Sequence, residues 1–76
     1  MNYNSFTAYR GHGDNFTPAS LIYEWAQANQ LESWQTMDGI RVRAGGDVWK
    51  YGHLAISEDG NRDKITVYME REPVYN

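Results

Sequence analysis

The feature that most constrains the fold is a change in the spacing of apolar residues near position 31. Before this point, apolar residues recur at the spacing of one helix face, at Leu21, Ile22, Trp25, Ala26, Ala28 and Leu31. After it, apolar and polar residues alternate with a period of two, which is typical of half-buried strands. The pattern therefore predicts one helix followed by a set of strands.

Both ends of the helix carry local signals. Thr17 can accept hydrogen bonds from the first free N–H groups of a helix, and Pro18 has the fixed φ that suits the first helical position. Phe16 is placed to pack back on the first turn, and Asn29 is the expected left-handed residue at the far end. We expect a helix of roughly three to four turns between these signals.

Two turns divide the segment that follows the helix. Asp38-Gly39 suits the tight turn of a hairpin formed by residues 34–37 and 40–44, because both residue types tolerate positive φ angles. Gly45-Gly46-Asp47 marks the next reversal of the chain. The sequence thus predicts an antiparallel arrangement.

The remaining strands are longer. Residues 48–56 form a strand in which Gly52 marks a bulge, and residues 64–71 form a last strand that Pro73 ends. Near the N-terminus, residues 3–10 alternate without a cleanly apolar face, and residues 1–16 are therefore expected to form either a flexible arm or an added edge strand.

These elements predict an α+β fold, a two-layer sandwich with one amphipathic helix packed on an antiparallel meander of three to four strands. The 76 residues suffice for a single domain spanning 1–76, and 41% apolar residues support a folded core. The helix stripe would meet apolar residues from the sheet: Ile40, Val42, Val48, Leu54, Ile56, Ile65, Val67 and Met69.

Charge and targeting signals narrow the class of protein. A net charge of −3 and a pI near 5.1 argue against direct binding of nucleic acid in general, although Arg41, Arg43 and Lys50 lie in predicted strands and can form a local basic patch. No apolar run approaches a membrane span, the first residues lack the pattern of a secretory signal, and cysteine is absent. We expect a cytoplasmic protein without membrane contact.

The most informative prediction concerns the sheet face that the helix does not cover. Alternation places aromatic side chains and arginines together there: Arg41, Arg43, Trp49, Tyr51, His53 and Tyr68. Aromatic residues and arginine are enriched at protein interfaces. Three occupants fit this face: the N-terminal segment with Tyr3, Phe6 and Tyr9, a second copy of the chain, or a foreign protein.

Acidic side chains suggest a second surface. Glu58, Asp59 and Asp63 in a predicted loop, or Glu24 and Glu32 on the helix, can compete for the basic groove of a partner that handles nucleic acid. A net charge of −3 is too small for a DNA mimic by charge alone.

Catalytic and metal signatures are weak in this sequence. No serine lies in a nucleophile elbow, and Gly11-His12-Gly13-Asp14 offers two metal ligands where zinc needs three or four. Residues 58–63 lack the ligand order of a calcium loop. We therefore expect no catalytic residue, no cofactor and no metal.

Together these observations predict a small acidic non-enzymatic protein-binding module. Short, acidic, aromatic-rich domains are common among accessory proteins of phages and mobile elements, and such a protein would inhibit a larger host complex by docking on it. Two alternatives stay open. One is an RNA-binding protein, or an RNA-cleaving one that uses His12 and His53 as acid and base; the other is a structural homodimer.

Overall fold

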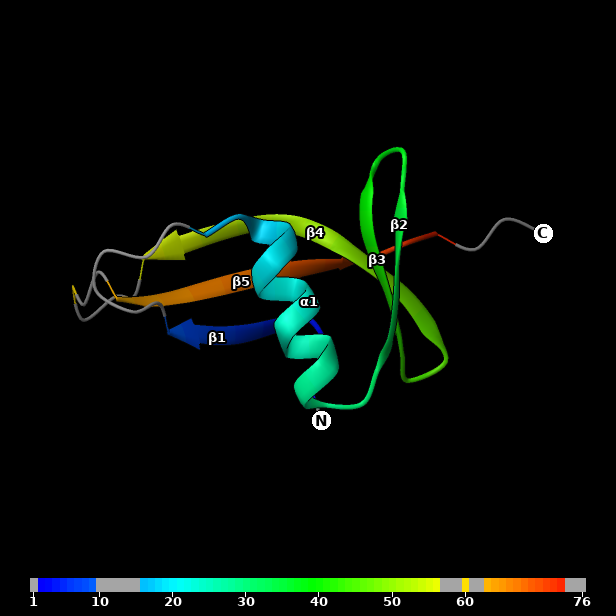
Figure 1. Ribbon diagram of the computed structural model, residues 1–76, viewed down its shortest axis with the longest axis horizontal. Coiled ribbons are helices and arrows are strands. Elements are labelled where there is room, and N and C mark those ends of the chain that lie inside the picture. The colour runs from blue at the N-terminus through cyan, green and yellow to red at the C-terminus, as the bar shows by residue number, and fades with distance from the viewer. Residues whose placement is uncertain (1, 10–15, 57–59, 61–62, 74–76) are drawn as a thin grey trace.

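The computed structural model describes residues 2–9, 16–56, 60 and 63–73. Across this part of the chain, one helix, α1 (Pro18–Ala28), packs on one face of a five-stranded antiparallel sheet (Figure 1). The strands are β1 (Ser5–Tyr9), β2 (Glu32–Thr36), β3 (Gly39–Ala44), β4 (Asp47–Ile56) and β5 (Lys64–Arg71), in the spatial order β1-β5-β4-β3-β2. The α+β prediction is confirmed, and the fifth strand is the N-terminal one.

The start of α1 follows the predicted signals. The backbone N–H of Ser20 donates to Thr17 Oγ1 at 3.1 Å, and the N–H of Thr17 donates to Ser20 Oγ at 3.1 Å, so the two residues cap each other. Pro18 occupies the first helical position as expected. In the described part of the chain, no helix has the length and apolar composition needed to cross a membrane.

The end of α1 differs from the prediction by one residue. Asn29 has φ −106°, and the left-handed residue is Gln30, with φ 58°. Leu31 N–H donates to Ala26 O at 2.8 Å and Gln30 N–H to Gln27 O at 3.2 Å, which is the bond pattern of a Schellman cap. This closure helps to offset the strain of positive φ at a residue that has a side chain.

The two predicted turns are present, and one of them is shifted. Thr36 pairs with Gly39, so Met37 and Asp38 form the β2–β3 turn, and Gly39, with φ 113°, opens β3. Thr36 Oγ1 accepts from Asp38 N–H and donates to Gly39 O, and the side chain thereby fixes the earlier turn. Gly45 and Gly46, with φ 62° and 83°, form the β3–β4 turn as predicted.

The core lies between α1 and the sheet, with Ile22, Val42 and Val67 fully buried. Three predicted core residues are placed differently. Ala28 is exposed at the end of α1, Ile56 is 60% exposed at the end of β4, and Val48 pairs with Arg43 on the side away from α1. Trp49, at 9% exposure, takes the core position that alternation gave to Val48.

The N-terminal segment completes this core. The Phe6 ring stacks on Trp25 with centroids 4.6 Å apart, and Tyr3 lies between Trp25 and Trp49 with centroid distances of 6.5 and 6.4 Å. Residues 5–9 therefore form an edge strand of the sheet, and Tyr3 and Phe6 pack toward α1. The expectation that this segment covers the opposite sheet face is wrong for the described residues.

Candidate functional site

A bulge at Gly52 decides which side chains of β4 share a face. Directly opposed residues of antiparallel strands point to the same side of the sheet. Tyr51 is opposite Met69, which is 6% exposed in the core, and the next pair is His53 with Tyr68, so Gly52 is the extra residue. Residues before Gly52 and after it consequently follow opposite alternations.

The predicted aromatic face is therefore divided between the two sides of the sheet. Trp49, opposite Val42, and Tyr51, opposite Met69, lie on the helix side. We call the other side the open face. It carries four residues of the predicted set, Arg41, Arg43, His53 and Tyr68. Neighbouring residues on the same face are Ser5, Thr7, Trp34, Lys50 and Thr66. The expectation of one shared face is wrong for Trp49 and Tyr51.

At one end of the open face, two aromatic rings are accessible. His53 is exposed and Tyr68 is 39% exposed, and their rings stack with centroids 4.6 Å apart and planes 12° from parallel. Ser5 and Thr66 lie beside them as small neighbours. A groove of about 560 Å³ adjoins the stack and includes Glu70 and Arg71 in its lining. This end combines a flat aromatic platform with nearby charges.

At the other end of the open face, both arginines form ion pairs with glutamates. Arg41 is buried, at 7% exposure, with Nε 3.4 Å from Glu72 Oε1 and Nη1 donating to Ile40 O at 3.3 Å. Arg43 Nε lies 3.1 Å from Glu32 Oε2, and its guanidinium lies 5.4 Å from the centroid of the Trp34 ring. The third cation, Lys50, is opposite Glu70.

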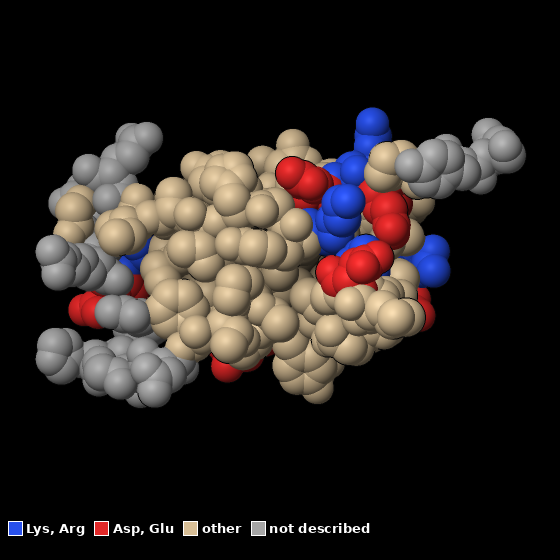
Figure 2. Space-filling model, turned by 90° about the horizontal axis from the view of Figure 1, so that it is seen from above, with Lys and Arg blue, Asp and Glu red and all other residues tan. Residues whose placement is uncertain are grey.

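Each cation of the predicted basic patch therefore has an acidic neighbour. Figure 2 shows positive and negative side chains intermixed at one end of the molecule, beside a wide area without charged residues. Mixed charges of this kind give no single-sign field to attract a polyanion. The charge pattern of this region does not favour nucleic acid.

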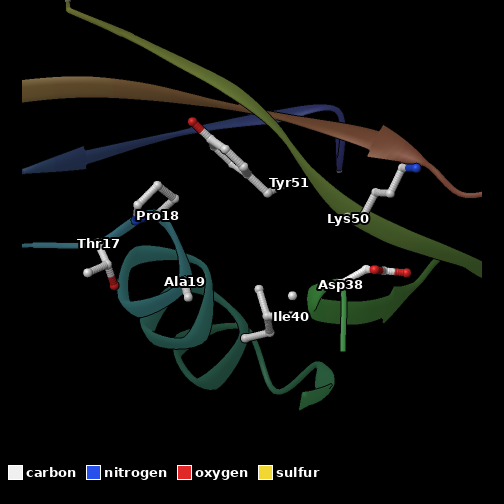
Figure 3. A pocket seen from close by; sticks show the side chains of 8 residues that line it. Thr17, Pro18, Ala19, Asp38, Ile40, Lys50 and Tyr51 are labelled. Carbon is white, nitrogen blue, oxygen red and sulfur yellow. The ribbon is translucent and has the colours of Figure 1, made fainter. Parts of the chain in front are cut away.

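Tyr51 lines a separate pocket on the helix side. This pocket, of about 290 Å³, lies between the start of α1, the β2–β3 turn and β4. Figure 3 shows Tyr51 pointing toward Pro18, with Asp38 and Lys50 at the other end. Its walls include Ile40 and Ala19 and fit a small apolar group.

The acidic residues predicted to form a second surface do not lie together in the described part of the chain. Glu24 is exposed on α1, whereas Glu32 lies in β2, not on the helix, and is paired with Arg43. Asp63 precedes β5, and Glu58 and Asp59 lie outside the described residues. His12, the proposed catalytic partner of His53, also lies outside them. Among the residues that the structure does describe, no group of three His, Asp or Glu is arranged to hold a metal.

Sequence reasoning missed Trp34 and Thr66 as members of the open face. Trp34 is opposite Arg41, and a signal for it was available, since alternation along the predicted hairpin places Trp34 beside the arginines. The burial of Arg41 could not be predicted from neighbouring residues, because its ion-pair partner Glu72 is distant in sequence.

Comparison with known proteins adds no relative. No family model matches the chain, and no curated protein or solved structure is significantly similar to it.

Proposed function

We propose that this chain is a non-enzymatic protein-binding module that docks on a larger partner through the open face of its sheet. The observation that carries the proposal is the exposed His53–Tyr68 stack, over which no element of the described chain packs. Aromatic side chains are enriched at protein interfaces, and those near the centre of an interface often contribute most of the binding free energy.

The arrangement of the open face supports a protein partner over other ligands. The stack offers apolar area, while Lys50 and Glu70, an opposed pair on the open face, offer charges of both signs for a polar rim. Ion pairing of Arg41 and Arg43 removes free cations that would attract phosphate. The acidic, cysteine-free sequence supports the further proposal of a cytoplasmic accessory protein, as in phages, that inhibits a host complex.

The test is affinity capture with the immobilised chain and matched tyrosine variants. Tyr68→Ala should weaken binding of the captured protein by about 2 kcal/mol, roughly thirtyfold, because it removes one ring of the stack. Tyr23→Ala is the control, since Tyr23 is 52% exposed on α1, away from the open face. Equal retention of the partner by both variants contradicts the proposal.

A second candidate, RNA binding or cleavage, is favoured by one observation, the exposed aromatic ring of His53 on an open antiparallel sheet. Salt separates the two candidates. RNA binding should fall steeply as salt rises toward physiological strength, whereas docking through aromatic rings should change little. Cleavage of RNA that His53→Ala abolishes would support the second candidate and contradict the first.

A further inference from the structure

β1 lies at one edge of the sheet, and no strand of the described residues pairs with its outer side. β1 pairs with β5 in an unbroken register of five residues, and its sequence Ser5-Phe6-Thr7-Ala8-Tyr9 has no charge and no proline. Natural proteins usually block such edges with charges, prolines or bulges, because unpaired strands associate. The opposite edge strand, β2, carries Glu32 in an ion pair with Arg43. The two edges thus differ in protection.

Backbone groups of β1 are directed outward at every second residue. Met69 N–H donates to Asn4 O at 2.7 Å, so Asn4 turns its backbone toward β5. In an antiparallel pair, the backbone N–H and C=O groups of successive residues point alternately toward the partner strand and away from it. Phe6 and Ala8 therefore point theirs toward β5, as Asn4 does. Ser5, Thr7 and Tyr9 point theirs toward the outer edge. A strand added there would meet three residues whose outward N–H and C=O groups are not paired with any described strand.

The helix α1 extends past the outer edge of β1 on one face of the sheet. Figure 1 shows α1 crossing β1 near the start of the strand, with the last turn of the helix extending past the edge. A groove of about 240 Å³ lies between the two elements, lined in part by Phe6, Ala8, Leu21, Trp25 and Ala28. The apolar lining fits a second apolar surface above the added strand.

We propose that the added strand is β1 of a second copy of this chain, antiparallel to the first about a twofold axis at Thr7. This pairing sets Phe6 opposite Ala8 of the second copy on the helix side, and Ser5 opposite Tyr9 on the open face. Large residues thus meet small ones in both rows, and Thr7 meets its equivalent, a favourable cross-strand pair. Because the pairing is symmetric, the same five residues supply both sides of it.

The position of α1 also favours a second copy. Figure 1 shows α1 crossing β1 near the start of the strand, so a twofold axis at the middle of the strand would place the second helix nearer the end of the first β1. On the open face, Tyr9, which is 72% exposed in one copy, gains Ser5 of the second copy as a neighbour. The two open faces would form one continuous surface.

The test is sedimentation equilibrium of the whole chain and of charge variants at Thr7. The wild type should dimerise, and Thr7→Lys and Thr7→Glu should each weaken the dimer by roughly tenfold, since like charges then face each other across the axis. An equimolar mixture of the two variants should recover the dimer, because opposite charges now pair. Gln35→Lys, a charge change at an exposed residue of the opposite edge strand, should leave the dimer unchanged.

Two outcomes overturn the proposal: a wild type that stays monomeric up to millimolar concentration, or a dimer that is equally stable in both Thr7 variants. If a variant fails to fold, amide exchange of the wild type decides. Protection of the Thr7 amide that increases with protein concentration supports the proposal, and protection that is independent of concentration contradicts it. Neither result depends on the proposed function of the open face.

Discussion

The two halves of β4 have opposite relations to the core. Before Gly52, Trp49 and Tyr51 lie on the helix side of the sheet, and after Gly52 the exposed His53 lies on the open face. All three are aromatic residues at odd positions of one strand. The difference shows that one inserted residue changes the role of every side chain on one side of it.

The first half of β4 contributes to stability. Trp49 is nearly buried, its ring contacts Tyr3, and its Nε1–H donates to Ala44 O at 3.0 Å. In the second half, His53 stacks on Tyr68 on the open face, whereas Leu54 packs against the core. We therefore expect substitution of Trp49 to change the free energy of unfolding and substitution of His53 to change binding.

The largest expected effect is that of Trp49→Ala. Truncation removes a buried ring and leaves a cavity beside Tyr3, so the free energy of unfolding should fall by about 3 kcal/mol. A small domain has little stability to lose, and the variant should be largely unfolded near 37 °C. Urea denaturation followed by circular dichroism measures this, with Tyr23→Ala as an exposed control. A loss below about 1 kcal/mol would place Trp49 outside the core.

Gly52→Ala tests the bulge itself. A Cβ at this position would lie 2.9 Å from Tyr68 O and 3.0 Å from Glu70 Cγ, and the backbone contact cannot be relieved by rotating a side chain. The unfolding free energy should fall by about 2 kcal/mol, as in other cases of overpacking. Amide chemical shifts of residues 51–53 and 68–70 should change together. An unaltered spectrum with wild-type stability would show that the bulge does not require glycine.

Trp49→Phe separates the hydrogen bond from the volume of the ring. Phenylalanine fills most of the site but leaves Ala44 O without its donor, so the loss should be about 1 kcal/mol. The same denaturation experiment gives the value. A negligible loss would assign the stability to the volume of the ring alone, and a loss as large as that of Trp49→Ala would assign it to the hydrogen bond.

The smallest expected effect is the coupling between His53 and Tyr68. Stacked rings that are exposed to solvent should contribute about 0.5 kcal/mol to the free energy of unfolding. A double-mutant cycle with His53→Ala and Tyr68→Ala measures this coupling. A coupling above about 2 kcal/mol would mean that the open face is part of the stabilising core.

Local signals predicted most of the fold. The Thr17-Pro18 start, the Gly45-Gly46 turn and the bulge at Gly52 each depend on the conformational preference of a few adjacent residues, and all three are present. The α+β class followed from the change in apolar spacing. These features are encoded within a few positions of the chain.

The faces of the sheet were predicted less well because they depend on register. Gly52 was recognised as a bulge, yet uniform alternation was applied through it, which put Trp49 on the wrong side and Val48 in the core. The burial of Arg41 depends on Glu72, and this carboxylate is brought to the arginine by the tertiary fold. Neither outcome follows from periodicity alone.

The most direct test of this account is the set of nuclear Overhauser effects from the aromatic rings of β4. The account predicts contacts of the Trp49 ring with Tyr3, of the Tyr51 ring with Met69, and of the His53 ring with Tyr68. Contacts of the Trp49 or Tyr51 rings with Tyr68, and of His53 with residues on the helix side, would contradict it. In that case β4 would alternate without interruption, and the division of the sheet at Gly52 would be wrong.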